Sequence, residues 1–211
     1  MNRLGLLIIV MLSVITTAMG QVEFGVRAGG SYSSLTQRFE DSYMSGGKMG
    51  FSVAGIADIH LYKRLSLRPE IAFVNQGGSY YSQPVQSGLA AYNKYRYYSI
   101  QVPVNLAFSF NLSDILFSVF AGPALDFSLF GKTNTQSNEL DSDINFGVEK
   151  EKDLKRFDLG VSLGIAVEYS KFFFSIDALC GALDRRSVER KGESSVFQNN
   201  VTFSLGYFFR K

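Results

Sequence analysis

Large apolar residues alternate with small or polar residues along most of the chain after position 21. The clearest stretch is residues 158–169, where every second position from Leu159 to Tyr169 is apolar and the positions between hold Asp, Gly, Ser, Ala or Glu. A repeat of two residues is the side-chain period of a β-strand. The pattern predicts eight strands, at residues 22–33, 48–60, 65–76, 97–110, 114–130, 155–169, 171–183 and 197–210.

The connections between these predicted strands alternate strictly between short and long. The short ones are residues 61–64, residues 111–113 and Ser170, whereas the first, third, fifth and seventh connections are long. Such alternation is expected of an antiparallel up-and-down meander, whose tight turns all lie at one end. The pattern therefore predicts one sheet of sequential hairpins.

The first twenty residues have the composition of a secretion signal. Arg3 precedes an apolar stretch from Leu4 to Ile15, and Ala18 and Gly20 form a small-x-small cleavage site. The apolar stretch is shorter than the ~20 residues that cross a bilayer as a helix. We expect residues 1–20 to be a signal peptide and residues 21–211 to form one outer-membrane β-barrel domain, because the lipid-facing backbone of secreted strands must be paired in a closed barrel.

Residue size decides which face of the predicted sheet points inward. The polar face is dominated by small residues such as Gly160, Ser162 and Gly164, whereas a water-exposed face would carry long Lys, Glu and Thr side chains. Small residues suit the narrow lumen of an eight-stranded barrel, and the branched and aromatic residues opposite suit hydrocarbon. We therefore favour a transmembrane barrel over a soluble ligand-binding barrel, which would enclose the apolar face.

The predicted fold is all-β, an eight-stranded antiparallel up-and-down transmembrane β-barrel that exists as a monomer. In the cell outer membrane, both termini and the tight turns would be periplasmic and the long loops extracellular. The barrel would contact outer-membrane lipid and lipopolysaccharide. The last strand, at residues 201–209, is rich in aromatic residues and resembles the terminal strand by which the outer-membrane assembly machinery recognises its clients.

A few charged residues interrupt the small-residue face. Charges in a narrow lumen are tolerated when they are paired and hydrogen-bonded, so we expect Arg27 and Arg68 to lie between the carboxylates. Such a polar plug would fix the strand register, and an ion or proton path along it stays open as an alternative. Eight strands leave no solute pore of porin size. The predicted lumen network consists of Glu23, Arg27, Asp58, Arg68, Glu70, Asp126, Asp158, Glu168 and Asp177.

Aromatic residues make up 14% of the chain and cluster near the predicted strand ends. Such clusters are typical of the two aromatic belts of a membrane barrel. The belts would comprise Tyr97, Tyr98, Phe108, Phe110, Phe127, Phe130, Tyr169, residues 172–174 and residues 207–209. Because proline cannot donate to a strand ladder and a closed barrel has no edge, we also expect local bulges at Pro69, Pro103 and Pro123.

Four segments carry a family resemblance: residues 65–78 (LSLRPEIAFVNQGG), 98–106 (YSIQVPVNL), 120–124 (FAGPA) and 158–164 (DLGVSLG). They resemble the PorT-like outer-membrane β-barrel family of Bacteroidetes, and the resemblance covers essentially the whole mature chain. Most members of that family are uncharacterised barrels. The member that names it is implicated in protein export by the type IX secretion system, so the resemblance implies a role in secretion. It supplies no catalytic motif.

The sequence offers little for catalysis or for binding of a cofactor, metal or nucleic acid, and we predict none of these sites. The net charge is +2 and basic residues are scattered among acidic ones, which argues against a nucleic-acid partner. His60, the only histidine, falls beside a tight turn, opposite the end where a lipid A-modifying enzyme would need its base. The segment from Asp141 to Asn145 begins like a calcium loop, but Phe146 takes the required glycine position. Cys180, the only cysteine, suits packing on an apolar face.

The long connections are the remaining candidates for activity. Residues 77–96 hold Tyr80, Tyr81, Tyr92 and Tyr95 among Gly, Ser and Gln, and tyrosine contacts proteins or glycans through an apolar ring with a polar tip. These tyrosines form a candidate partner-binding loop. The alternative is that this connection, like residues 131–154 and 184–196, is a solvated loop that faces lipopolysaccharide and divalent cations. The sequence favours a non-enzymatic structural or interaction protein that acts in protein secretion or surface adhesion, with a secretion-system or extracellular protein as partner. A small-molecule or ion conduit and a lipid A-modifying enzyme stay open as alternatives.

Overall fold

The structure is a computed structural model that describes residues 22–38, 43–82, 91–135, 138–149, 152–187 and 195–210. The predicted signal peptide, residues 1–20, lies outside the described residues. Within the described ranges the chain forms nine strands: β1 (Val22–Arg38), β2 (Tyr43–Tyr62), β3 (Leu65–Ser82), β4 (Ala91–Leu112), β5 (Ile115–Thr135), β6 (Asn138–Asp143), β7 (Phe157–Tyr169), β8 (Phe172–Gly181) and β9 (Ser195–Phe208).

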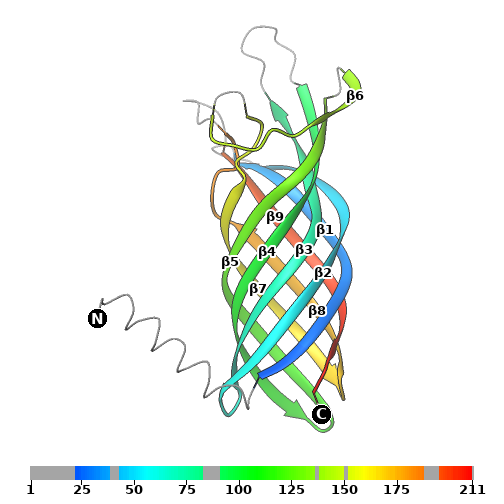
Figure 1. Cartoon of the computed structure of the whole chain (residues 1–211), viewed down its shortest axis with the longest axis vertical. Helices are drawn as coiled ribbons and strands as arrows, with labels where there is room; N and C mark the ends of the chain where they lie inside the picture. Colours follow the sequence, from blue (N-terminus) through cyan, green and yellow to red (C-terminus); the bar gives the residue numbers. More distant parts are fainter. Residues whose placement is uncertain are drawn as a thin grey trace, which may run out of the picture.

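Eight of these strands form a closed antiparallel barrel (Figure 1). The ring runs β1, β2, β3, β4, β5, β7, β8, β9, and the pairing of β9 with β1 closes it. The short strand β6 pairs with β5 and stands outside the ring. The predicted eight-stranded antiparallel barrel is therefore confirmed, and β6 is an addition within a connection that the sequence analysis treated as a long loop.

Three two-residue turns join strands at one end of the barrel, which we call the turn end. They consist of residues 63–64, 113–114 and 170–171. The first residue of each turn is left-handed, with φ of 47° at Lys63, 58° at Ser113 and 60° at Ser170. Two-residue hairpins favour turns with positive φ because their twist matches that of the flanking strands. β1 begins and β9 ends at this same end, and the longer connections lie at the opposite end, the loop end (Figure 1).

Most strands run further toward the loop end than predicted, whereas β7 and β8 stop two residues short of their predicted bounds there. β1 continues five residues past position 33, β3 continues past position 76 to Ser82, and β4 begins at Ala91 instead of position 97. On β4 the outward positions of this extension include Lys94 and Arg96, which are exposed. The alternation of apolar and polar residues therefore ends before the hydrogen-bonded ladder does, so it does not mark the true end of these strands.

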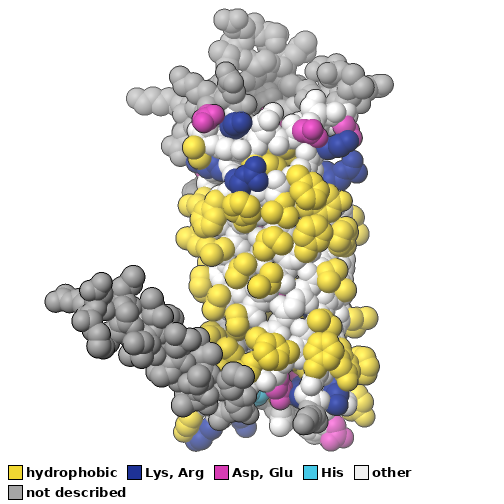
Figure 2. All heavy atoms as spheres, viewed as in Figure 1, with side chains coloured by type: hydrophobic (Ala, Val, Ile, Leu, Met, Phe, Trp, Pro, Cys, Tyr) yellow, Lys and Arg dark blue, Asp and Glu magenta, His cyan; other side chains and the backbone are white. Residues whose placement is uncertain are grey.

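Side chains alternate between the lumen and the outer surface, as β7 illustrates. Val161 is 51% exposed and its neighbour Ser162 is 4% exposed, and this alternation runs along the strand. The outer surface carries a broad band of apolar side chains (Figure 2). The apolar face is thus on the outside, so the alternative of a soluble barrel with an apolar interior is wrong. In the described part of the chain, no helix is long and apolar enough to cross a membrane.

The bulges predicted at the three strand prolines are wrong. The register of β3 with β4 passes through Pro69, that of β4 with β5 through Pro103, and that of β5 with β7 through Pro123, in each case without a shift there. Each proline instead lacks a pairing with its other neighbouring strand, because it has no N–H to donate. Two successive residue pairs are missing from the ladder beside each proline, and the register on either side of the gap is unchanged.

Candidate functional site

Arg27 on β1 joins carboxylates from two other strands inside the lumen. Its Nε and Nη2 donate to Glu70 Oε1 on β3 at 3.1 and 2.5 Å, and its Nη1 donates to Asp177 Oδ2 on β8 at 2.8 Å. The same Nη1 donates to Ser204 Oγ on β9 at 2.7 Å. Arg27 and Glu70 are each only 7% exposed. One guanidinium therefore ties together four strands across the barrel.

Two further arginines hold the remaining predicted residues near the turn end. Arg68 Nε donates to Asp58 Oδ2 at 2.6 Å. Arg210, just past β9, donates from Nη1 to Glu23 Oε2 at 2.9 Å and contacts Glu168. Arg210 was not among the predicted lumen residues. The strand period could have identified it, because Arg210 lies two positions after the lumen-facing Phe208 and therefore falls on the same face.

An apolar layer fills the lumen beside these ion pairs. The rings of Phe173 and Phe208 lie 4.8 Å apart between centroids and pack with Ile56. The free space that these side chains share with Arg27 and Arg68 amounts to about 20 Å³, room for about one water molecule. The lumen is filled at this level.

Three aromatic residues assigned to the outer belts lie in the lumen instead. Tyr97 is fully buried, and Phe173 and Phe208 are 5% and 3% exposed. Successive side chains of a strand point to opposite faces, so a run such as residues 172–174 cannot lie wholly in one belt. Phe172 and Phe174 do face outward, as do Tyr169 and Phe130.

The other two predicted residues, Asp126 and Asp158, lie toward the loop end and have different partners. Asp126 Oδ2 accepts from Gln76 Nε2 and from Gln101 Nε2, both at 2.7 Å. Asp158 Oδ1 accepts from the backbone N–H of Leu183 at 3.1 Å. Gln76 and Gln101 were not predicted to belong to the lumen network, because an uncharged amide side chain on the small-residue face does not indicate a partner.

The connections at the loop end fold over the barrel mouth as a cap, which we define as residues 144–149, 152–156 and 182–187. Its backbone is hydrogen-bonded to the barrel and to itself: Ile144 N donates to Gly131 O at 2.9 Å, and Lys155 N donates to Arg185 O at 2.7 Å. Its apolar side chains form a cluster with lumen residues of the barrel wall. The cluster consists of Leu35, Tyr95, Tyr97, Ile144, Phe146, Leu154 and Val196.

Arg185 carries a positive charge from the cap into the barrel. It is fully buried, its Nη2 donates to Ser128 Oγ at 2.7 Å, and its guanidinium lies 5.7 Å from the centre of the Tyr97 ring. Its charge also acts on the carboxylate of Asp158. Arg185 was not predicted to be buried, because the acidic and basic residues around it in the sequence give no sign that one of them is buried.

All four tyrosines of the predicted partner-binding loop belong to strands. Tyr80 and Tyr81 belong to β3 and Tyr92 and Tyr95 to β4, with Tyr81 directly opposite Tyr92. A loop over residues 77–96 is therefore wrong in extent. Tyr95 is 6% exposed and packs in the cap cluster, so it does not offer its ring to a partner, and the side chains of the other three lie outside the described residues.

A model of the outer membrane protein beta-barrel domain family matches residues 16–181 of the chain. The chain belongs to this family. Membership supports the predicted location in the outer membrane. No curated protein sequence matches the chain.

Three bacterial proteins are among the solved structures that are similar to this outer-membrane barrel. The attachment invasion locus protein Ail of Yersinia pestis is 14% identical with a TM-score of 0.46, over 90% of this chain and 99% of that chain. Neisserial surface protein A is 13% identical with a TM-score of 0.45, over 87% and 96% of the two chains. OprG from Pseudomonas aeruginosa is 10% identical with a TM-score of 0.47, over 90% and 97%.

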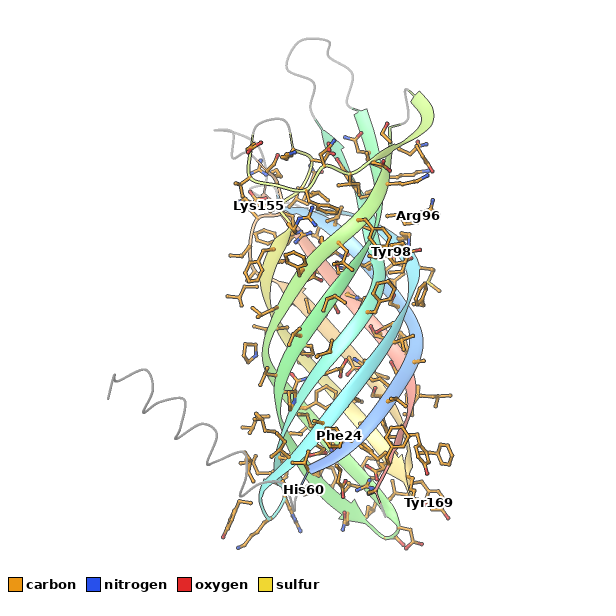
Figure 3. All side chains as sticks on the ribbon, viewed as in Figure 1. Phe24, His60, Arg96, Tyr98, Lys155 and Tyr169 are labelled. Atoms are coloured by element: carbon orange, nitrogen blue, oxygen red, sulfur yellow. The ribbon has the colours of Figure 1, made fainter. Side chains whose placement is uncertain are left out.

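His60, Cys180 and the segment that begins like a calcium loop lie in different parts of this outer-membrane barrel. His60 is exposed near the turn end (Figure 3). It lines a pocket together with Lys63, Arg64 and Arg210. Cys180 faces outward and is exposed. The segment that begins like a calcium loop is partly strand, since β6 extends to Asp143 and pairs with β5. Among the described residues, no group of three or more His, Cys, Asp or Glu could hold a metal ion.

The packing of the cap predicts a measurable cost for Leu154→Ala. Leu154 is fully buried in the cap cluster, so truncation should lower the free energy of cap opening by about 2–4 kcal/mol. Limited proteolysis of the folded protein should then cut the cap much faster. Val148→Ala is the matched control, because Val148 is also part of the cap but is 74% exposed. Equal cleavage rates for Leu154→Ala and the wild type would contradict a packed cap.

Asp184 makes the cap sensitive to acid. Partial burial raises the pKa of Asp184, but hydrogen bonds from the Arg186 guanidinium and from the backbone N–H groups of Val196 and Arg186 outweigh it, so its pKa lies below the ordinary value. A lowered folded-state pKa stabilises the cap above the unfolded-state pKa of about 4, and this stabilisation is lost as the pH falls through the folded-state pKa. The contribution is therefore present at neutral pH and absent in strong acid.

The expected result is that Asp184→Asn lowers cap stability by about 1 kcal/mol at neutral pH and by progressively less in acid. Hydrogen exchange of the cap amides in both proteins at a series of pH values measures this difference. A difference that stays constant into strong acid would show that the carboxylate charge does not hold the cap.

Proposed function

We propose that this protein is a non-enzymatic, monomeric outer-membrane barrel that acts at its loop end as an interaction protein, in surface adhesion or as an accessory of protein secretion. The observation that carries this proposal is the cap, in which Leu154 and Arg185 are fully buried over a filled lumen. A sealed lumen leaves the outward surfaces of the barrel and cap as the working parts. Long connections on a rigid barrel are the usual place for binding residues.

The proposal places the turn end and both termini in the periplasm and the cap outside the cell. Short turns on the periplasmic side and longer loops outside are the rule for outer-membrane barrels. The basic residues Lys63 and Arg64 in the first turn would then face the periplasm. β9, with its aromatic residues, would be the strand that the assembly machinery reads during insertion.

The secretion arm of the proposal comes from the resemblance to the PorT-like barrels of Bacteroidetes, and a component of a type IX-like secretion system would be the partner. The adhesion arm comes from the loop-end tyrosines. Tyr80, Tyr81 and Tyr92 lie where β3 and β4 reach furthest beyond the belt of Tyr98. There an extracellular protein or glycan would contact them.

The two rival functions receive less support from the geometry. A conduit needs a continuous path, whereas the space around Arg27 and Arg68 is about 20 Å³ and the mouth above it is occupied by the cap. A lipid A-modifying enzyme needs its base at the outer leaflet, whereas His60 lies at the turn end (Figure 3). In the proposed orientation that end is periplasmic.

A deletion strain complemented with the wild-type protein or with a tyrosine variant distinguishes the adhesion role from the secretion role. Cells that carry a chain with Tyr80, Tyr81 and Tyr92 all changed to serine are compared with wild-type cells for attachment to a surface and for the proteins they release. Lost attachment with unchanged release supports adhesion, and lost release supports the secretion role. Wild-type behaviour of the deletion strain in both assays would overturn the proposal.

A further inference from the structure

Two cations face each other on the outer surface at the loop end of β4 and β5. Arg96 is directly opposite Lys132 in the register of these strands, and both side chains are exposed. Like charges in directly opposite positions destabilise a strand pair. Two acidic residues of β6 lie nearby: Asp141 Oδ2 is 3.8 Å from Arg96 Nη2, with both side chains about half exposed, and the exposed Asp143 is opposite Lys132 in the register of β5 with β6. Exposed ion pairs of this kind contribute little. The pair is therefore arranged to accept an external anion.

An aromatic patch lies directly on the membrane side of these cations. Tyr98 is opposite Phe130, with 5.0 Å between ring centroids, and Phe73 stacks on Tyr98 at 5.4 Å. Figure 3 shows Arg96 and Tyr98 on the same side of the barrel, with Arg96 nearer the loop end. Figure 2 shows the same order over a wider area, with basic side chains just beyond the apolar band.

A groove of about 520 Å³ joins the cations to the aromatic patch. Arg96, Lys132 and Asp143 line its polar side, and Tyr98, Phe130 and Leu129 line its apolar side. The groove lies at an irregularity in the ladder: Tyr98 pairs with Phe130 but Ser99 pairs with Ser128, so Leu129 is an extra residue. A second pocket of about 540 Å³ shares Arg96 and Lys132 and is also lined by Lys48, Lys94 and Asp141.

A third cation borders the extra residue from the side of β7. Arg156 Nη1 donates to the carbonyl oxygens of Ser128 and Leu129 at 3.1 and 3.0 Å, and its guanidinium lies 5.7 Å from the centre of the Phe127 ring. Arg156 is exposed. Cations therefore flank the apolar groove on two sides at the level where the apolar band ends.

We propose that this groove binds a phosphorylated glycolipid of the outer leaflet, of the lipid A class. Arg96 and Lys132 would hold a phosphate, and Tyr98 and Phe130 would contact the first part of an acyl chain. The ligand must be anionic where it meets water and apolar where it meets the barrel wall. A phosphoglycolipid has both parts, and it lies in the leaflet that surrounds the groove. The inference rests on the proposed orientation, in which the loop end is extracellular.

The test measures binding of bisphosphorylated lipid A to the full chain folded in an uncharged detergent. The variant R96Q/K132Q is compared with K63Q/R64Q, which removes two exposed cations at the turn end instead. We expect the first variant to bind at least about tenfold more weakly than wild type and the second to bind as wild type does. Lipid A from which both phosphates have been removed should bind the wild-type protein as weakly as phosphorylated lipid A binds R96Q/K132Q.

Equal binding by R96Q/K132Q and wild type would overturn the site, as would equal binding of phosphorylated and dephosphorylated lipid A. Inorganic pyrophosphate that competes as strongly as the glycolipid would overturn the apolar half of the proposal. Heat-modifiable migration on a gel confirms that each variant is folded. Attachment and protein release by cells that carry R96Q/K132Q are measured separately, so loss of lipid binding and failure of the interaction role are distinguished.

Discussion

Replacing Arg27 with methionine is expected to lower the free energy of unfolding by about 3–5 kcal/mol. Arg27 is buried and is paired with Glu70 and Asp177, so the change leaves two carboxylates in the lumen without their cation. Urea unfolding of the protein in lipid vesicles, followed by circular dichroism, measures the difference. The chain has no tryptophan, so the β-sheet signal is the suitable probe.

A second variant shows whether this cost arises from unpaired charge. R27M/E70Q/D177N removes the guanidinium and both carboxylates together, and it should regain most of the lost stability because no uncompensated charge remains. Arg64→Met at the exposed first turn is the matched single change and should alter stability by less than about 0.5 kcal/mol. A triple variant as unstable as Arg27→Met would mean that the packing of Arg27, and not its charge, holds the strands together.

Gly29→Ala should destabilise the barrel by about 2–3 kcal/mol or prevent its assembly. A Cβ at position 29 would collide with the backbone carbonyl of Phe203 and the Cα of Ser204 on β9. Backbone atoms of a paired strand cannot move aside as a flexible side chain can. Unfolding in urea, together with the yield of the heat-modifiable band, measures the effect.

The neighbouring glycine provides the matched control. Gly30 faces outward, and a Cβ at that position would meet nothing within 4 Å. Gly30→Ala should therefore leave stability within about 0.5 kcal/mol of wild type, or raise it slightly by restricting the unfolded chain. If both alanine variants are equally stable, close approach of β1 and β9 at Gly29 does not limit residue size in the lumen.

Alternation and residue size were sufficient to predict the barrel and its inside-out arrangement. Val161 and Ser162 occupy the faces that their side chains suggest, because hydrocarbon outside and a narrow lumen inside impose opposite requirements on size and polarity. The tight turns were likewise predictable from short connections. The exact turn residues, such as Lys63, depend on the local twist of the hairpin, and the alternation pattern does not report that.

The partners within the lumen could not be derived from the sequence, although most of the lumen residues could be named. Arg27 and Asp177 are 150 positions apart, and their contact depends on the closure of the ring by β9. Arg185 was missed because a connection has no period that would show which of its side chains is buried. The cap depends on packing between residues far apart in the sequence, such as Leu154 and Tyr97. No local sequence pattern predicts it.

Recording of the wild-type protein in a planar lipid bilayer tests most directly whether the barrel is closed. With the lumen filled around Arg27 and the mouth covered by the cap, the expected result is no stepwise conductance under an applied voltage. Stable single-channel steps in the wild type that change in size with Asp126→Asn would contradict a sealed lumen. They would show instead that ions pass along the lumen carboxylates and that the protein is a conduit.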